Sequence, residues 1–495
     1  MPESWANYGI DLHLDLTGSR VRAGLEAALR DAVRTGRLAV STRLPSSRDL
    51  AADLGISRNT VADAYSQLVA EGWLEARTGS GTWVAEQATF WRQPAGGQVP
   101  VAAGPRYDLR AGVPAVSAFP RRAWLTAGRA ALVAADDGAL EYPDPRGLTG
   151  LRTALAGYLA RARGVIASPD NVVICAGFAH GLATICQVLA ARGAASVATE
   201  AYGHRLHRRI IEAQGLRLAA LPVDANGATP PEPAPPEPAL SALARPEAAE
   251  DIRAVVLTPA HQFPLGMTLA PGRRTAFARW AVRTGGVIIE DDYDGEFRFD
   301  RQPVGAMQAL APSHVVYAGT ASKSLAPGLR LGWLVVPDPM IDEVLAVKEQ
   351  SGFFNGSLDQ LSLASFITSG AYDRQIRQSR LAYKRRRDRL IAALAREVPA
   401  VRLSGIAAGL HAVAELGWQE REDDVIARAA THGVAIEGLG RYAAGLGHQA
   451  GEGLGFRAGE GNERGPALVV GYGRPAEHAF TTAVSRLCAA LADRS

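Results

Sequence analysis

The segment TASKSLAPGLR, at residues 320–330, combines the functional groups that would bind an aldehyde carrying a phosphate. Lys323 supplies a primary amine, which can lose its proton and attack a carbonyl carbon. Thr320, Ser322 and Arg330 supply two hydroxyls and a guanidinium, which are suited to hydrogen bonding with a phosphate. The segment therefore predicts covalent attachment of a phosphorylated aldehyde at Lys323.

The rarity of lysine in this chain supports a chemical role for Lys323. Lysine occupies only three of the 53 positions that hold lysine or arginine. Lys348 and Lys384 lie in segments with the pattern of polar helix faces, so we expect both to be solvated surface charges. Arginine remains protonated in proteins and cannot replace a reactive amine. We therefore expect Lys323 to be kept for its nucleophilicity.

Short apolar strands alternate with helical segments beyond residue 165. The strand-like segments are NVVICAG, ASVATE, LRLAALPV, IRAVVLTP, GVIIED, HVVYAG and LGWLVV. Such alternation is typical of an α/β fold with a mostly parallel sheet, in which ligands bind at the carboxyl ends of the strands. We therefore expect the polar residues that follow these strands to meet at one site.

A glycine between a predicted strand and a predicted helix indicates an anion site. In CAGFAHGLATICQVLAARG, Gly177 lies at this junction, and Phe178 and Ala179 begin the helix. Backbone amides at a helix N-terminus favour a bound anion. The amides of these two residues could therefore hold a phosphate.

Two other strand ends suit an aromatic heterocycle. Asp291 ends a buried strand in VIIEDDYDGEF, where a carboxylate needs a positive partner such as a protonated pyridine nitrogen. His261 and Gln262 precede a proline turn in TPAHQFPLG and could donate hydrogen bonds to a phenolic oxygen. The amine, the phosphate donors, the carboxylate and these side chains together describe a site for pyridoxal 5'-phosphate (PLP).

Residues 20–84 show the pattern of a winged helix-turn-helix. Apolar residues at helical spacing and capping signals predict three helices, over about 20–35, after Pro45 and after Ser57. The following segment, GWLEARTGSGTWVAE, predicts a two-stranded wing. The order of these elements therefore predicts a DNA-binding module.

The start of the third predicted helix would face DNA. Its exposed side chains are those of Ser57, Arg58, Asn59 and Thr60. In a helix-turn-helix these positions meet the edges of the bases. The wing tip, from Arg77 to Gly81, could approach the phosphate backbone because glycine permits close contact.

Residues 42–85 resemble the GntR-type winged helix through their whole length. The resemblance implies contacts with double-stranded operator DNA by Arg48, Ser57, Arg58 and Asn59, and by Thr78 and Gly79 in the wing. Residues 1–87 contain nine arginines and eleven acidic residues. Affinity for DNA would therefore depend on locally placed arginines rather than on a basic domain.

These patterns divide the chain into three parts. We predict an α+β winged helix-turn-helix over 11–86, a linker rich in glycine, proline and glutamine over 87–107, and an α/β domain over 108–495. A second proline-rich stretch, at 227–251, predicts a surface loop that interrupts the α/β domain.

The strand-end motifs resemble those of fold type I aminotransferases in order and spacing, over residues 108–495. With the GntR-like head, the whole chain resembles the MocR/GabR group of transcriptional regulators. The resemblance implies that PLP is the cofactor and that Lys323 forms its internal aldimine. It also implies that Asp291, or the adjacent Asp292, pairs with the pyridine nitrogen and that Tyr293 bonds the phenolic oxygen.

The same resemblance bears on assembly. Tyr142, in EYPDPRGLTGLR, resembles a tyrosine that fold type I enzymes donate across their dimer interface. Because the active sites of that fold are shared between two subunits, the resemblance implies a homodimer. Two DNA-binding heads in a dimer would imply two operator half-sites.

Three positions bear on the ligand. Relatives that bind amino-acid carboxylates carry an arginine in the last strand, where this chain has Val469, although Arg464 and Arg474 are near. A second arginine of the GABA-responsive relative corresponds to Leu206, and the aromatic residue that stacks on the cofactor ring corresponds to His204. Loss of both arginines argues against a GABA-like acid as the ligand.

Two functions from different classes follow. The first is a transcription factor whose aminotransferase-like domain senses PLP, or an amine that reacts with it, and thereby changes the affinity for DNA. The second is an active PLP-dependent aminotransferase fused to a DNA-binding domain. A helix-turn-helix has no use in a free metabolic enzyme, so we favour the sensor and do not expect turnover.

The remaining features define the setting. The three cysteines are widely spaced, which argues against a disulfide framework and a metal site. Neither a signal-peptide pattern nor an apolar stretch of about 18 residues is apparent, so we expect a cytoplasmic protein without a membrane span. The basic segment 372–390 would either contact DNA or form a solvated or domain-packing helix face.

Overall fold

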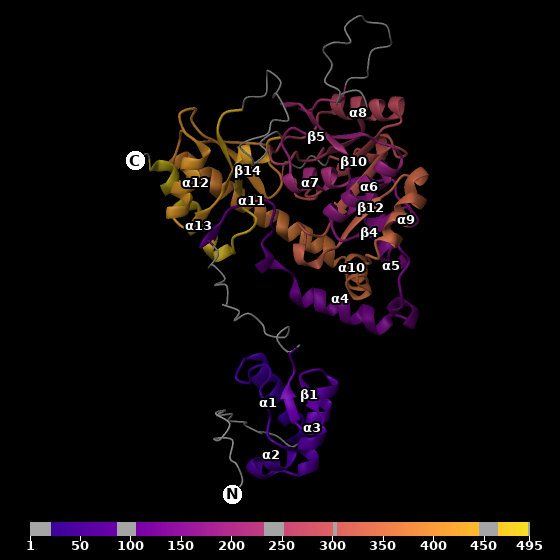
Figure 1. Cartoon of the computed structure of the whole chain (residues 1–495). Helices are drawn as coiled ribbons and strands as arrows, with labels where there is room; N and C mark the ends of the chain where they lie inside the picture. Colours follow the sequence, from indigo (N-terminus) through magenta and orange to yellow (C-terminus); the bar gives the residue numbers. More distant parts are fainter. Residues whose placement is uncertain (1–20, 87–104, 232–251, 300–303, 445–463, 494–495) are drawn as a thin grey trace, which may run out of the picture. The chain divides into compact units, whose positions relative to one another are not determined.

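The computed structural model describes residues 21–86, 105–231, 252–299, 304–444 and 464–493. They belong to two compact units, which divide between residues 103 and 104 (Figure 1). Three predicted segments lie wholly or mostly outside the described residues: 11–20 of the first domain, 87–104 of the linker and 232–251 of the proline-rich loop.

The smaller unit consists of three helices and a two-stranded hairpin. Its elements are α1 (Val21–Arg34), α2 (Ser47–Leu54), α3 (Arg58–Ala70), β1 (Leu74–Arg77) and β2 (Gly81–Val84). Ser46 caps α2 by accepting a hydrogen bond from the amide of Asp49, and Gly55 ends this helix with a left-handed φ of 66°. The short turn after Gly55 leads into α3, which completes the helix-turn-helix.

A separate core holds this unit together. Leu25 of α1, Leu50 of α2 and Val61 of α3 are fully buried against one another. β1 and β2 pair antiparallel, and a bridge between Arg43 and Trp83 extends the hairpin. The helices and the wing therefore form one packed module.

A seven-stranded sheet forms the centre of the larger unit. Its strand order is β4 (Val172–Cys175), β12 (Gly332–Val335), β11 (Val315–Thr320), β10 (Val287–Asp291), β9 (Ile252–Leu257), β5 (Ser196–Glu200) and β6 (Arg217–Leu221). β12 runs antiparallel to its two neighbours, and the other pairs are parallel. The carboxyl ends of the parallel strands therefore share one edge of the sheet.

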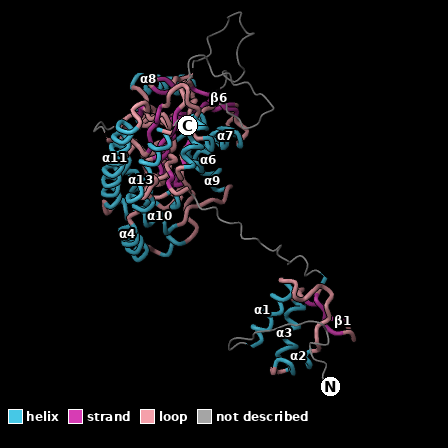
Figure 2. The backbone as a smooth tube through the Cα atoms, turned by 90° about the vertical axis from the view of Figure 1, so that its left-hand side faces the viewer, coloured by secondary structure: helices cyan, strands magenta, loops and turns pink. Residues whose placement is uncertain are grey.

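Helices cover both faces of this sheet (Figures 1 and 2). One face packs against α6 (Phe178–Ala191), α7 (Arg205–Ala213) and α9 (Ile341–Gln350), and the other against α5 (Thr149–Arg163) and α8 (Pro271–Thr284). In β9, Ala254 and Val256 enter one core while Val255 and Leu257 enter the other. Burial on both faces explains why these strands are apolar throughout.

A smaller antiparallel sheet lies beside the first. Its order is β13 (Arg402–Ser404), β14 (His411–Glu415), β17 (Ala467–Gly471) and β16 (Glu437–Gly438). The helices near this sheet are α11 (Ala371–Glu397), α12 (Glu422–Thr431) and α13 (Glu477–Ala492), while α4 (Arg121–Ala134) packs on α10 (Ser357–Thr368). Two short pairs complete the unit: β3 (Tyr107–Asp108) with β15 (Val434–Ala435), and β7 (Val223–Asp224) with β8 (Gly227–Ala228).

The expectation that Lys348 is a surface charge is wrong. Lys348 is only 2% exposed, and its Nζ donates a hydrogen bond to the carbonyl of Pro145 at 2.6 Å. The polar residues of its segment suggested a solvated position. Lysine can nevertheless be buried when its aliphatic stem packs in a core and its amine donates a hydrogen bond to a carbonyl. Lys384 is exposed, as expected, and pairs with Asp388 at 2.8 Å.

Two arginines of the basic helix α11 form hydrogen bonds within the larger unit. Arg386 is buried and bonds the carboxylate of Glu477 at 2.9 Å, and Arg380 donates to the carbonyl of Glu296 at 2.7 Å. These contacts favour the packing alternative over a DNA contact at both positions. Within the described residues, no helix is both long enough and apolar enough to cross a membrane.

Candidate functional site

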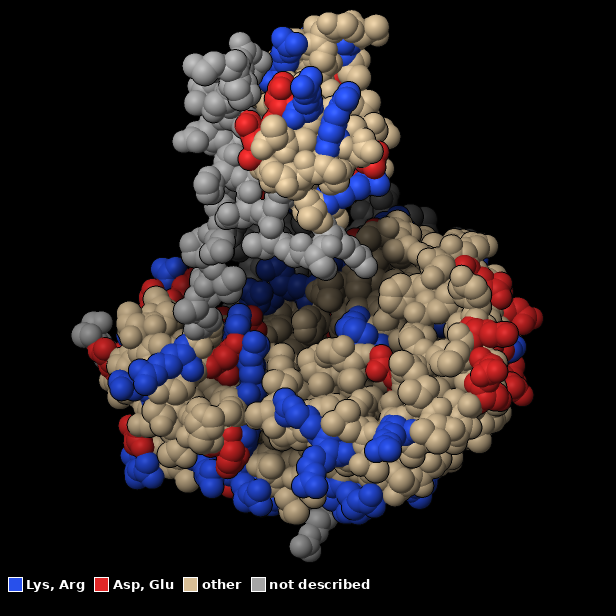
Figure 3. Space-filling view, turned by 90° about the horizontal axis from the view of Figure 1, so that it is seen from below, with Lys and Arg blue, Asp and Glu red and all other residues tan. Residues whose placement is uncertain are grey.

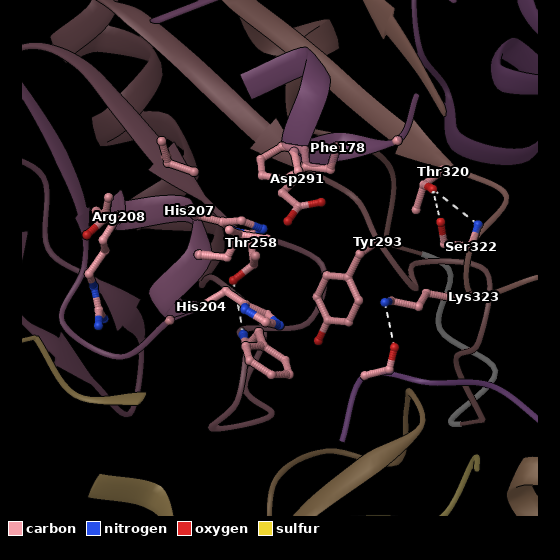
Figure 4. A pocket seen from close by; sticks show the side chains of 18 of the residues that line it. Phe178, His204, His207, Arg208, Thr258, Asp291, Tyr293, Thr320, Ser322 and Lys323 are labelled. Atoms are coloured by element: carbon pink, nitrogen blue, oxygen red, sulfur yellow. Dashed lines mark hydrogen bonds between the residues drawn. The ribbon is translucent and has the colours of Figure 1, made fainter. Parts of the chain in front are cut away.

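A cavity of about 220 Å³ lies where the parallel strands end (Figure 4). β5, β9, β10 and β11 contribute residues at or just beyond their carboxyl ends, namely Glu200, Thr258, Asp291 and Thr320. Other predicted residues on its wall are Gly177, Phe178, Ala179, His204, Tyr293, Ser322, Lys323 and Arg330. The strand topology therefore brings most of the predicted cofactor contacts together.

Lys323 reaches into this cavity and is partly buried. Its Nζ donates a hydrogen bond to the carbonyl of Gly112 at 2.6 Å (Figure 4). Burial lowers the pKa of Lys323 because the charged form loses hydration, and the negative charges of Asp291 and Asp294 oppose this shift. A lowered pKa increases the fraction of neutral amine, which is the form that attacks an aldehyde.

The structure separates the adjacent carboxylates Asp291 and Asp292. Asp292 forms a bidentate ion pair with Arg163, at 2.6 and 3.0 Å, and accepts a hydrogen bond from the hydroxyl of Tyr317 at 2.8 Å. Asp291 instead lines the cavity, where burial raises the pKa of its carboxyl well above the usual value and Lys323 opposes the shift. Asp291 is therefore the carboxylate that a ligand can reach.

One corner of the cavity gathers hydrogen-bond donors. The Thr320 hydroxyl donates to Ser322 Oγ at 2.9 Å and accepts from the amide of Ser322 at 3.1 Å. Gly177 precedes α6 with a φ of 84°, and no side chain caps this helix. A β-carbon on Gly177 would lie 3.6 Å from Arg330 Nη1, so the helix N-terminus and the guanidinium are close. Such a corner suits a phosphate.

Tyr293 lies within hydrogen-bonding distance of a pair of buried polar residues that do not line the cavity. Its hydroxyl lies 3.1 Å from His261 Nδ1, and the same nitrogen lies 2.8 Å from Asp294 Oδ2. When Nδ1 carries the proton and donates it to Asp294, the hydroxyl proton of Tyr293 is left free to donate elsewhere. The arrangement thus presents Tyr293 as a donor beside Lys323 (Figure 4).

His261 and Gln262 themselves do not reach the cavity wall, contrary to expectation. The amide of Gln262 donates to the carbonyls of Tyr202 and Phe263, at 2.9 and 2.8 Å, and its oxygen accepts from the amide of Leu265 at 3.0 Å. Phe263 lines the cavity instead. Turn geometry decides which of these consecutive residues points inward, and the sequence does not reveal it.

The described residues include cavity features that sequence reasoning missed. Glu200 is buried, and burial raises the pKa of its carboxyl to about 7 while Thr258 donates a hydrogen bond to it at 2.5 Å. Phe263 was also missed, and its ring stacks on that of the predicted residue His204 with centroids 5.3 Å apart. Burial also holds the pKa of His207 well below its usual value. Glu200 is the last residue of β5 and Phe263 lies in a turn, positions that could have singled them out, whereas His207 lies in the first turn of α7.

Three further positions bear on the ligand and the dimer, and they lie in different environments: Tyr142, Val469 and Leu206. Tyr142 is 99% exposed and does not line the cavity of its own chain. Val469 is fully buried in the core, whereas Leu206 lies on the cavity wall. The single chain therefore gives Tyr142 no contact with its own site.

The predicted DNA contacts divide into capping and free side chains. Ser57 Oγ accepts a hydrogen bond from the amide of Thr60 at 3.1 Å and bonds the Thr60 hydroxyl at 2.9 Å, so both side chains stabilise the start of α3. Arg48, Arg58 and Asn59 are exposed. Figure 3 shows several cationic side chains, with acidic ones beside them, on one face of this unit.

The wing tip is exposed and its arginine is held in place. Arg77 donates to Glu75 at 2.7 Å and lies 4.8 Å above the ring of Trp83. Thr78 and Gly79 form the tip, where Gly79 has a φ of 73° that favours glycine. Sequence reasoning missed Arg43, which is exposed beside the wing and 6.0 Å from the same Trp83 ring.

Comparison with known proteins matches both units. The family described as aminotransferase class I and II matches residues 108–414, and the family described as bacterial regulatory proteins, gntR family, matches residues 22–84. The HTH-type pyridoxine biosynthesis transcriptional regulator PdxR of Corynebacterium glutamicum is 31% identical over 438 residues, which is 87% of this chain and 91% of that protein. The probable rhizopine catabolism regulatory protein MocR of Rhizobium meliloti is 32% identical over 435 residues, or 83% of this chain and 85% of that protein.

The chain belongs to the MocR-type family of helix-turn-helix transcriptional regulators. In this MocR-type regulator, the smaller unit is the GntR-family DNA-binding domain, as the winged-helix pattern predicted. The larger unit has the aminotransferase fold, which confirms the predicted fold class. An archaeal alanine:glyoxylate aminotransferase aligns with a TM-score of 0.66 at 21% identity, over 80% of this chain and 92% of that chain.

Proposed function

We propose that this MocR-type regulator binds PLP at Lys323 and uses the bound cofactor, or an amine that reacts with it, to change the affinity of its winged helix for operator DNA. One observation carries the proposal: a buried carboxylate, an amine with a lowered pKa and an anion corner converge in a single cavity. PLP, when bound, supplies an electrophilic aldehyde and an electron-withdrawing pyridine ring.

Each group of the cavity has a task in this proposal. Lys323 supplies the neutral amine, and Asp291 supplies the negative charge that keeps the pyridine nitrogen protonated. Tyr293 donates its hydroxyl proton to the phenolic oxygen, while His261 and Asp294 position that hydroxyl from behind. His261 and Gln262 are thus no longer proposed as direct contacts.

The anion corner would hold the phosphate. Thr320 and Ser322 contribute hydroxyls, Arg330 contributes a guanidinium, and the amides that follow Gly177 contribute the N-terminus of α6. The ring of His204 lies on the cavity wall, where it would stack on the pyridine ring.

Enzymatic transamination is the competing function, because every group proposed to contact the cofactor is present in the cavity. Turnover also requires that the substrate carboxylate be held in register with the amine. Val469 is buried and apolar at the position where the resemblance expects an arginine for this purpose. We therefore propose sensing without turnover.

We also propose a homodimer that acts on DNA in the cytoplasm. Exposed apolar side chains gather on α4 and on the segments near it, which is unusual for a surface that stays in water. They include Leu125, Leu132, Val133, Leu140, Tyr142 and Leu358. A second copy that covers this surface would bring Tyr142 to a partner.

The decisive experiment measures binding of the full chain to DNA from upstream of its own gene and of the neighbouring genes, with and without PLP. Lys323→Ala is the control, because it removes the amine and leaves the DNA-binding domain intact. We expect PLP to shift the affinity of the wild type and to leave the variant unchanged. If PLP shifts neither protein, an amine must be tested as the signal, and rapid turnover of an amino acid by the wild type would support the enzyme instead.

A further inference from the structure

A second cavity, of about 440 Å³, adjoins the candidate cofactor site and is rich in arginine. Its charged lining residues are Arg110, Arg205, Arg209, Arg441, Arg474 and Glu437. His204 and Leu206 line both cavities, so the two share a wall. Five guanidiniums therefore surround a space next to the proposed site of amine chemistry.

Among the residues that the structure describes, two carboxylates balance these arginines. Asp108 Oδ2 lies 2.6 Å from Arg110 Nη2 and 3.0 Å from Arg474 Nε, so one carboxylate serves two guanidiniums. Glu437 pairs with Arg441 at 3.1 Å. Five guanidiniums and two carboxylates leave an excess of three positive charges at this cavity.

Arg205 and Arg209 carry the unbalanced charge. Neither forms an ion pair with any residue in the described part of the chain. They lie four residues apart on α7, an arrangement in which like charges face each other and destabilise the helix. No side chain caps the N-terminus of α7, which adds a partial positive charge at the same place. An anion bound here would relieve both effects.

We propose that this cavity, which we call the arginine cavity, binds the acidic end of the effector. The effector is then a small primary amine that also carries at least two negative charges, on carboxylates or on a phosphate. Guanidiniums bind both groups through paired hydrogen bonds. The assignment rests on the proposed function, because the amine end lies at Lys323 in the neighbouring cavity.

The first test titrates full-length protein loaded with PLP and follows the absorbance of the cofactor. Ethanolamine and O-phosphoethanolamine differ only in the phosphate, and L-glutamate supplies carboxylates. We expect at least one of the two anionic amines to bind about tenfold or more tightly than ethanolamine, because charge-assisted hydrogen bonds contribute at this scale. The identity of that amine separates phosphate from carboxylate as the source of the charge.

Matched variants connect this preference to the arginine cavity. The double variant Arg205→Gln/Arg209→Gln should reduce the preference about tenfold and retain the cofactor absorbance. Arg217→Gln removes an exposed arginine of β6 outside the cavity and should change nothing. Equal affinities for ethanolamine and both anionic amines in the wild type would overturn the proposed effector class.

A second test is independent of the cofactor. Calorimetry of the PLP-free protein with inorganic pyrophosphate should detect binding that the double variant weakens about tenfold. A protein that takes up no PLP but shows this difference would contradict the proposed function and keep the anion site. Identical pyrophosphate binding by the wild type and the double variant would rule out the arginine cavity as an anion site.

Discussion

Side chains of the same type have different tasks in this protein, and their surroundings make the difference. Asp291 and Asp292 are adjacent in the chain, yet one lines a cavity and the other is locked in an ion pair with Arg163. Lys323 and Lys348 both lie away from bulk water, yet only Lys323 lies on the cavity wall. These contrasts allow each role to be tested with a neighbouring control.

Asp291→Asn should mainly weaken PLP binding, whereas Asp292→Asn should mainly lower the free energy of unfolding. Asp291→Asn removes the charge opposite the pyridine nitrogen, so PLP affinity should fall about tenfold or more while the free energy of unfolding changes little. Asp292→Asn leaves the buried Arg163 without its anion and should lower the free energy of unfolding by about 3–5 kcal/mol. Denaturant unfolding and PLP titration measure both quantities, and equal behaviour of the two variants would contradict the assignment.

The burial of Lys348 predicts that the free energy of unfolding depends on pH in the alkaline range. Burial lowers the pKa of Lys348, with Cys175 and Asp144 opposing the shift, so the unfolded chain binds more protons than the folded chain just below the usual lysine pKa of 10.5. The free energy of unfolding of the wild type should therefore rise with pH in this window, relative to Lys348→Met. Denaturant unfolding at pH 7 and near pH 9.5 measures the difference. A difference that is independent of pH would show that Lys348 titrates normally.

Helix ends position the functional groups at both sites. The uncapped N-terminus of α6 lies at the candidate cofactor cavity, whereas the N-terminus of α3 is capped internally by Ser57. A helix end without a protein cap retains unsatisfied amides, which an anion can use. Capping at α3 instead leaves Arg58 and Asn59 as the free groups on the end that we expect to face DNA.

Arg58→Ala should weaken operator binding without destabilising the smaller unit. Arg58 is exposed at the start of α3, and loss of a base or phosphate contact costs about tenfold in affinity. Arg22→Ala, at an exposed position of α1 away from the helix-turn-helix, is the matched control. Binding assays at several salt concentrations distinguish the two kinds of contact, since only loss of a phosphate contact reduces the salt slope. Unchanged affinity of the Arg58 variant would remove this residue from the interface.

In the proposed function a ligand site controls a DNA site, and the proposed assembly of two copies is the first step of that control. The exposed apolar residues of α4 include Leu125 at 70% and Val133 at 81% exposure. Burial of such side chains against a second copy is favourable by about 25 cal/mol for each Å² of apolar surface.

A charge placed on this surface should dissociate the proposed dimer. Leu125→Asp would bury an unpaired carboxylate in the interface, so we expect a monomer by light scattering and weaker binding to a two-half-site operator. Leu310→Asp changes an exposed leucine on a different segment and should leave the mass unchanged. A wild type that is already monomeric would contradict the homodimer.

The sequence alone was sufficient for the features that depend on local order. Capping serines and helical spacing predicted the winged helix-turn-helix, and alternating apolar strands predicted the α/β fold. The chemistry proposed for Lys323 likewise rests on its rarity and its hydroxyl neighbours. Such features can be read directly because they involve residues a few positions apart, where periodicity and capping chemistry dominate.

Tertiary structure decided what depends on direction and on distant partners. It turned Phe263 rather than Gln262 into the cavity, paired Asp292 with Arg163 across 129 residues, and buried Lys348. It also gathered the arginines of α7 with Arg110, Arg441 and Arg474 around one cavity. Charge density at a point in space is set by chain folding over hundreds of residues, so no local pattern of the sequence could have predicted the arginine cavity.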